Sequence, residues 1–235
     1  YEPDFLSFSP STVIVPSIMY DFPDLAMTLD DVYQNYFAFV KRVPRNGLIV
    51  GNSDWSRMKR MRVHLADRKI ETYGFERDAM WQIHDVTYTD TSSTFSLKTE
   101  RQILGPLTIP FVGRFFVSSA AGVAVAAMLD GIPLEVVGQA LETLPAIDRY
   151  FVTQTDAVGR VVIDDCADNP ATIEDVFLLV KKRFPGKKIW CLYQSGSFLR
   201  SKAFQAEYES VLGVADFIYL ADISGQPKEK TEGVH

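Results

Sequence analysis

The sequence predicts an α/β protein, and three of its features point to that class. β-branched runs alternate with amphipathic helical segments in both halves of the 235-residue chain, as expected for the strands and crossover helices of parallel sheets. Polar loops follow the carboxyl ends of several runs, where such sheets bind ligands. Between Trp81 and Ile109 the apolar period changes to two, which indicates a β-ribbon within the α/β pattern.

The first part of the chain is predicted to be strand and helix in turn. Buried strands are expected at 12–15, 47–52 and 69–73, because each is a short apolar or β-branched run. A helix is expected to begin near Thr28, since apolar residues then recur at helical spacing and acids occupy the first turn. A second helix, rich in Arg and Met, is expected at 54–65.

The β-ribbon is expected to contain a hairpin loop at 90–93 and to be broken by Gly105-Pro106. A buried helix rich in Ala and Val then spans 115–129, with Gly131 as its C-cap. Another helix is expected at 132–144, and the chain then enters a second domain.

The second domain opens with the clearest strand–loop–helix pattern of the chain. The β-branched run 161–163 ends in two acids, and a cap residue and a proline then begin an amphipathic helix. Further strands are expected at 189–193 and 217–220, with a helix between them. We therefore expect neighbouring parallel strands whose ligand-binding loops are 164–169 and 194–197.

Bulk properties exclude several classes of protein. The chain is 47% hydrophobic, and its formal charge of −6 and pI near 5.1 argue against a nucleic-acid-binding protein. Cys166 and Cys191 match no metal or redox spacing, so reduced thiols are expected. These thiols are those of a cytoplasmic protein. No apolar run reaches the ~20 residues of a membrane span, so no membrane-spanning helix is expected. A chain that begins at Tyr1 without Met is interpreted as a fragment.

Four short motifs in the second domain follow the order seen in one enzyme family. They read Asp164-Asp165-Cys166-Ala167-Asp168-Asn169-Pro170, Phe184-Pro185-Gly186-Lys187, Tyr193-Gln194 and Arg200-Ser201-Lys202-Ala203. They resemble the Asp-Asp-Tyr-Ala-His-His-Pro, Phe-Pro-Gly-Lys, Phe-Gln-Pro-His and Arg-Thr-Lys-Ala motifs of the Mur ligases, which are ATP-dependent amide-forming enzymes of peptidoglycan synthesis. Earlier in the chain, Val43-Pro44-Arg45-Asn46-Gly47 is similar to a Val-Pro-x-x-Gly motif of the family's central domain.

The resemblance implies a fold and a reaction. It implies an incomplete P-loop-type central domain with a β-ribbon at 1–148, and an incomplete Rossmann-like carboxy-terminal domain with a parallel sheet at 149–235. It is strongest to the branch that joins UDP-N-acetylmuramate to L-alanine, and so implies ATP and Mg²⁺ as cofactors and a UDP-sugar and an amino acid as substrates. The phosphate-binding Gly-Lys-Ser/Thr loop does not occur in this sequence; in the family it lies upstream of the position of Tyr1. The oligomeric state stays open.

The resemblance also assigns roles to three residues. Asp165 corresponds to an acid of the family's nucleotide site and Arg149 to an arginine at the crossing between domains, so both are candidates for binding the nucleotide cofactor. Arg200 corresponds to a substrate-contacting arginine. Structural roles stay open: Asp165 as a turn or capping acid, Arg149 as an interdomain ion-pair former, and Arg200 as a solvated side chain. Asp21 and Asp24 are interpreted as loop and cap acids, and neither a catalytic residue nor a metal ligand is assigned.

Several family positions carry residues that lack the family's chemical groups. Phe22 and Met19 stand in place of a histidine and an acid, Tyr150 in place of an arginine, and Asp168 and Asn169 in place of paired histidines. A phenyl ring, for example, can neither donate to a phosphate nor accept from an amide. Two hypotheses follow: an ATP-dependent ligase with impaired activity, or a catalytically degenerate homologue that serves as a nucleotide-binding or scaffold module.

Overall fold

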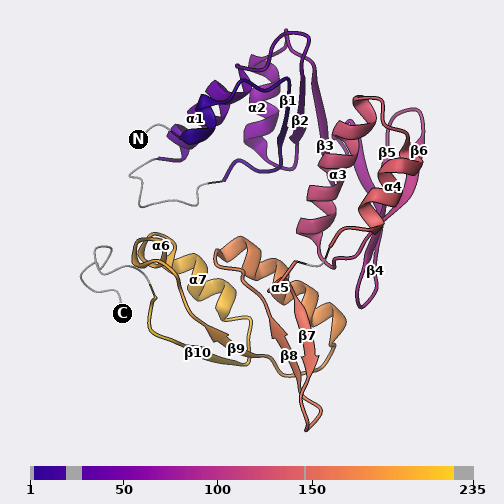
Figure 1. Cartoon of the computed structure of the whole chain (residues 1–235). Coiled ribbons are helices and arrows are strands. Elements are labelled where there is room, and N and C mark those ends of the chain that lie inside the picture. The colour runs from indigo at the N-terminus through magenta and orange to yellow at the C-terminus, as the bar shows by residue number, and fades with distance from the viewer. Residues whose placement is uncertain (1–2, 20–27, 146, 225–235) are drawn as a thin grey trace. The chain divides into compact units, whose positions relative to one another are not determined.

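The structure is a computed structural model that describes residues 3–19, 28–145 and 147–224. These residues divide into two compact units (Figure 1): the first contains 3–19 and 28–145, and the second contains 147–224. Each unit has hydrophobic clusters of its own, so each is described by itself. Helices and strands alternate along the chain, which confirms the predicted α/β class.

One sheet of six strands organises the described part of the first unit. Its strands are, in spatial order, β1 (Thr12–Val15), β2 (Leu48–Asn52), β3 (Ile70–Gly74), β4 (Trp81–Tyr88), β5 (Ser93–Lys98) and β6 (Ile103–Ile109). Strands β1 to β4 are parallel, and β4 to β6 are antiparallel. The predicted strands and ribbon are therefore confirmed, with β1 and β6 at the edges of the sheet.

Helices cover both faces of the parallel part of this sheet. They are α1 (Leu29–Val40), α2 (Ser56–His64) and α3 (Arg114–Leu129), with a short 3₁₀-helix, η1 (Asp4–Ser7), against α1. Helix α4 (Leu134–Glu142) packs against β6 of the ribbon and against α3. Strand β2 alternates between two clusters: Ile49 packs with residues of α1 and α2, whereas Leu48 and Val50 pack with residues of α3. Both faces of β2 are buried, which explains its continuously apolar sequence.

Helix α1 begins where the sequence predicts, directly after Thr28. The Thr28 hydroxyl oxygen accepts the N–H of Asp31 at 3.2 Å, and the Asp31 carboxylate accepts the N–H of Thr28 at 2.7 Å. This reciprocal capping box satisfies two backbone donors at the helix start. Hydrogen bonds from the Thr28 side chain and backbone hold the pKa of the Asp31 carboxyl below its usual value.

The ribbon differs from the prediction at Gly105-Pro106. These residues do not break it: they lie inside β6 and are joined by a cis peptide. Because β6 is an edge strand, the N–H that proline lacks can face outward without removing a hydrogen bond of the ladder. The register of the β5–β6 pair shifts between Phe95 and Leu97, opposite this position.

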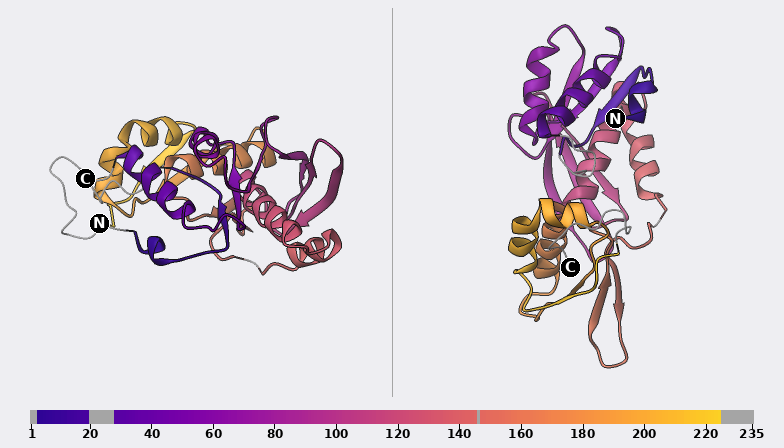
Figure 2. Two further views of the ribbon diagram at one scale, coloured as in Figure 1. Left: turned by 90° about the horizontal axis from the view of Figure 1, so that it is seen from above. Right: turned by 90° about the vertical axis from the view of Figure 1, so that its left-hand side faces the viewer.

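The described part of the second unit contains two short sheets and the helices that follow β8 and β9 along the chain. Its elements are β7 (Val152–Thr155), β8 (Val161–Asp164), α5 (Pro170–Arg183), β9 (Trp190–Tyr193), α6 (Phe198–Ala203), α7 (Gln205–Leu212) and β10 (Phe217–Leu220). Helices α5 and α7 lie side by side (Figures 1 and 2). They enclose a small core with β9, made of Ile173, Phe177, Tyr208, Val211 and Leu212.

Strand pairing in the second unit differs from the prediction for β8. Strands β9 and β10 are parallel, as expected, but in the described residues β8 pairs with β7, in an antiparallel hairpin that Figure 2 shows as a narrow ribbon. Its short turn is closed by Asp156, whose carboxylate accepts the N–H groups of Val158 and Arg160 at 3.0 and 2.8 Å. A short turn favours a local antiparallel pair, whereas alternation along the chain does not specify which strands are neighbours.

Candidate functional site

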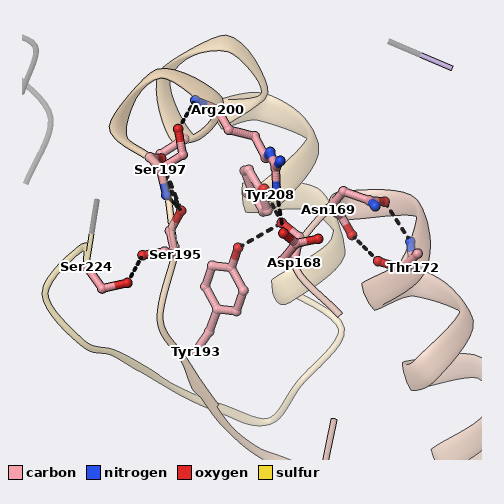
Figure 3. A network of polar contacts seen from close by, with 10 residues as sticks. Asp168, Asn169, Thr172, Tyr193, Ser195, Ser197, Arg200, Tyr208 and Ser224 are labelled. Carbon is pink, nitrogen blue, oxygen red and sulfur yellow. Dashed lines mark hydrogen bonds and ion pairs between the residues drawn. The ribbon is translucent and has the colours of Figure 1, made fainter. Parts of the chain in front are cut away.

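The loop that follows β8 contacts strand β9 and the helices α6 and α7 in the second unit (Figure 3). The backbone carbonyl of Asp168, in the first loop, accepts the hydroxyl of Tyr193 from β9 at 3.3 Å and that of Tyr208 from α7 at 2.6 Å. The Asp168 carboxylate forms an ion pair with Arg200 of α6. One acidic residue therefore joins a strand and two helices of this unit.

Both tyrosines are hydrogen-bond donors at neutral pH, and burial raises the pKa of each further above that range. Burial raises the pKa of Tyr208, and the hydrogen bond with Tyr193 raises it further. Burial also raises the pKa of Tyr193. Because both phenols stay protonated at neutral pH, both can donate to the Asp168 carbonyl.

Arg200, predicted to bind substrate, is not the solvated side chain that the alternative interpretation expected. Its side chain is only 15% exposed, because it lies against the β8 loop and pairs with Asp168. The backbone N–H of Arg200 donates to the hydroxyl of Ser197, the cap residue of α6, at 3.2 Å. A guanidinium held in this way is a preorganised partner for a carboxylate.

Asp165, predicted to bind nucleotide, uses both carboxylate oxygens within the unit. One accepts the N–H of Phe151 at 2.8 Å and the other accepts the N–H of Ala167 at 2.7 Å. Next to it, the N–H of Cys166 donates to the carbonyl of Arg149 at 2.8 Å. Asp165 thus clamps the segment before β7 to the loop after β8, which is the turn role left open by the sequence. The nucleotide role stays a prediction, since a carboxylate has further lone pairs.

Arg149 lies at this clamp but points to solvent. Its guanidinium is 3.6 Å from Asp164 in its own unit, and both side chains are more than half exposed. Its backbone has a φ of +61°, and Phe151 has a φ of +54°, a left-handed conformation that non-glycine residues rarely adopt. The clamp therefore brings Arg149 and Asp165 together, whereas Arg200 belongs to the Asp168 network.

Asn169 begins helix α5, as its sequence position suggested. Its side-chain oxygen accepts the N–H of Thr172 at 3.0 Å, and Pro170 occupies the first turn. We expect Asn169→Ala to destabilise the second unit by about 1 kcal/mol, because this donor then loses its cap. Urea unfolding of the second unit measures the loss. Asn169→Asp keeps an acceptor at the same place and should retain most of the stability; equal stability of the alanine variant and the wild type would contradict the cap.

A serine cluster orders the loop after β9 and was not predicted. The Ser201 hydroxyl lies 2.7 Å from that of Ser195 and donates to the carbonyl of Ser197 at 2.8 Å. The Ser224 hydroxyl donates to the carbonyl of Ser195 at 3.2 Å (Figure 3). Ser195 is buried. A serine directly before a helix is a common cap, so Ser197 could have been recognised from the sequence.

The first unit has a polar cluster at the carboxyl ends of β2 and β3 that the sequence also did not single out. Asp54 accepts the N–H groups of Phe75 and Glu76 at 2.9 and 3.0 Å, and it lies 3.8 Å from the Arg114 guanidinium. That guanidinium stacks 3.6 Å from the centre of the Phe75 ring. The available signal was an acid directly after a strand, in the position where α/β sheets place ligand groups.

Three expectations concern ligands, loops and membranes. Asp21 and Asp24, with Phe22, lie outside the described residues. Within residues 3–19, 28–145 and 147–224 no three or more His, Cys, Asp or Glu side chains form a cluster that could hold a metal ion. No helix in the same ranges is both long and apolar enough to cross a membrane.

Comparison with known proteins decides the family. Residues 4–127 match the Mur ligase middle domain, which is more than half of the chain and includes the β1–β6 sheet and most of α3. The chain belongs to the Mur ligase family. The resemblance of the sequence motifs to those of Mur ligases is therefore confirmed.

Relatives within the family match along the whole chain. The UDP-N-acetylmuramate–L-alanine ligases of Streptococcus gordonii and Streptococcus pyogenes are 30% and 28% identical to it over 99% of its length. The chain spans about half of these relatives, since it covers 51% of each. Both described units therefore have counterparts in the same relatives.

Solved structures of the family share the fold. MurF from Acinetobacter baumannii matches 93% of this chain with a TM-score of 0.75 and 15% identity, and the chain covers 48% of it. The UDP-N-acetylmuramate–alanine ligase MurC from Thermotoga maritima matches 92% with a TM-score of 0.69 and 17% identity, and the chain covers 52% of it. A folylpolyglutamate synthetase from Lactobacillus casei also matches 95%, with a TM-score of 0.63 and 14% identity, over 52% of its own length. The names of these enzymes refer to different substrates, so the shared fold does not by itself identify the substrate of this chain.

Proposed function

We propose that this chain carries the central and carboxy-terminal domains, 1–148 and 149–235, of an ATP-dependent ligase that joins UDP-N-acetylmuramate to L-alanine in the cytoplasm. The observation that carries the proposal is the 28–30% identity to UDP-N-acetylmuramate–L-alanine ligases over 99% of the chain. That match spans both units, so it rests on more than the shared fold of the first. The substrates are a UDP-sugar carboxylate and an amino acid.

The proposal gives roles to residues of the second unit. Asp165 and Arg149, which the backbone clamp holds together, contact the nucleotide, and Arg200 contacts the carboxylate of a substrate. ATP and Mg²⁺ enter through the family alone, because no described residue is assigned to the phosphates or the metal.

The test is release of ADP by the purified protein in its full natural length. We expect release that requires UDP-N-acetylmuramate and L-alanine together and that stops when either is omitted. Replacing L-alanine by L-alaninamide, which keeps the attacking amine but has no carboxylate, shows whether the amino-acid carboxylate is recognised. No ADP release with any UDP-muramyl substrate would contradict the ligase proposal.

The second candidate is a homologue without turnover that binds nucleotide or serves as a scaffold. It is favoured by the structural roles of Asp168 and Asn169, which occupy the positions of the family's paired histidines. One forms the ion pair with Arg200 and the other caps α5, so both positions have structural roles, and neither side chain is an imidazole. Calorimetry distinguishes the two forms of this hypothesis. Micromolar binding of Mg-ATP without ADP release supports a nucleotide-binding module, whereas no binding of Mg-ATP supports a scaffold.

A further inference from the structure

The two partners of the Asp168–Arg200 ion pair differ in their exposure to solvent. The Arg200 side chain is 15% exposed, whereas that of Asp168 is 56% exposed. Arg200 follows the loop after β9, and Asp168 lies in the loop after β8. Solvent, and any solute, therefore reaches this ion pair mainly from the side of the carboxylate.

Asp168 is positioned by its backbone and not by its side chain. Its carbonyl accepts the hydroxyls of Tyr208 and Tyr193, and the next residue, Asn169, caps α5 (Figure 3). These bonds hold the main chain at this point whether or not the carboxylate carries a charge. Neutralising the side chain of Asp168 therefore leaves the loop in place and changes only what the guanidinium contacts.

We propose that Asp168 is a built-in competitor at a carboxylate-binding arginine. Its carboxylate occupies the Arg200 guanidinium, and a small-molecule carboxylate that binds this arginine must displace it. A guanidinium recognises a carboxylate through the same N–H donors whichever molecule supplies it. Arg200 follows the loop at the carboxyl end of β9, a strand of the parallel pair, which is a usual ligand position in α/β folds. The inference rests on the substrate-binding role proposed for Arg200 and adds the residue with which the ligand competes.

The cost of this competition is modest. Ion pairs with an exposed partner are weak, so displacement of the Asp168 carboxylate lowers the apparent affinity for a ligand by about two- to fivefold. Asp168→Asn, which keeps the size of the side chain, removes that cost. It should therefore bind carboxylates more tightly than the wild type, which is the opposite of the effect expected for a residue that contacts the ligand favourably.

The test is an NMR titration of the whole chain. The Nε–H resonance of Arg200, identified by its loss in Arg200→Lys, is followed with L-alanine as the carboxylate probe and L-alaninamide as the matched probe without a carboxylate. We expect L-alanine to shift this resonance with a Kd two- to fivefold lower in Asp168→Asn than in the wild type, and L-alaninamide to leave it in place. Arg160→Gln, which removes an ion pair in the distant β7–β8 hairpin, should titrate like the wild type.

Several results would overturn the competition. They are equal Kd values in Asp168→Asn and the wild type, a weaker Kd in the variant, or no response of the Arg200 resonance to L-alanine in either protein. Asp168→Ala controls for a local effect of the asparagine side chain. It also removes the charge, so it must show the same decrease in the Kd for L-alanine. The titration needs neither ATP nor turnover, so its failure and a failure of the ADP assay are separate results.

Discussion

Asp165→Ala is expected to destabilise the second unit by about 2–4 kcal/mol, because a carboxylate that accepts two backbone N–H groups is lost. These groups belong to Phe151 and Ala167, at 2.8 and 2.7 Å. The loss exceeds that of an ordinary turn, since Phe151 has a φ of +54° and Arg149 a φ of +61°. Residues in this conformation persist only when neighbouring contacts hold them there.

Hydrogen exchange resolved to individual amides measures this effect. In Asp165→Ala the amides of Phe151 and Ala167 should exchange faster, and the second unit should unfold at lower urea. Asp156→Ala is the matched control, because Asp156 also accepts two backbone N–H groups but does so in the hairpin turn, where water can replace it. Asp165→Asn keeps one carbonyl acceptor, so its stability and its amide exchange rates should lie between those of the wild type and those of Asp165→Ala. Unchanged exchange in Asp165→Ala would show that the carboxylate is not a clamp.

Gly122→Ala is expected to destabilise the first unit by about 1–3 kcal/mol, although alanine normally favours a helix over glycine. Gly122 lies in α3 against Tyr73 of β3, and a Cβ there would lie 2.7 Å from the Cζ and the hydroxyl oxygen of that ring. Tyr73 is fully buried, which raises the pKa of its hydroxyl to about 12. A ring enclosed in a close-packed core cannot move aside without shifting its neighbours.

Urea unfolding of the same substitution, glycine to alanine, at two helical positions separates the effect of this clash from that of helix propensity. Gly138→Ala in α4 is the control, since a Cβ there meets only a Leu107 methyl at the ordinary distance of 3.6 Å. That variant should be neutral or more stable by up to about 1 kcal/mol. Tyr73→Leu in the Gly122→Ala background should recover part of the stability by removing the ring. If the two alanine variants were equally stable, the close approach of α3 to β3 would be refuted.

Local features of the fold were predictable because their causes lie within a few residues. The start of α1 at Thr28 follows from a capping box of four residues, and the start of α5 follows from Asn169 and the proline after it. The β-ribbon was also predictable, because the alternation of apolar and polar residues that identifies it acts between near neighbours in the sequence. The error at Gly105-Pro106 has a long-range cause: proline is tolerated in β6 because that strand is at an edge, which depends on the order of the strands.

The candidate site was predictable in its residues more than in its contacts. Resemblance to the family named Asp165, Arg149 and Arg200, but neither it nor the sequence indicated that Asp165 accepts the N–H of Phe151 or that Arg200 pairs with Asp168. Asp54 and the Ser195 cluster were missed, because an acid or a serine after a strand has many ordinary roles. Their importance is visible only through the backbone groups that they bind.

By itself, the sequence determined the α/β class, the positions of most helices and strands, and membership of the Mur ligase family. Those properties depend on periodicity, caps and motifs, which act over short stretches of chain. Only the tertiary structure decided that, in the described residues, β8 and β9 belong to different sheets and that Asp168 meets Arg200 across 32 residues. Such contacts form when distant segments are packed against one shared core, so their partners are set by the folded chain and not by any single stretch of it.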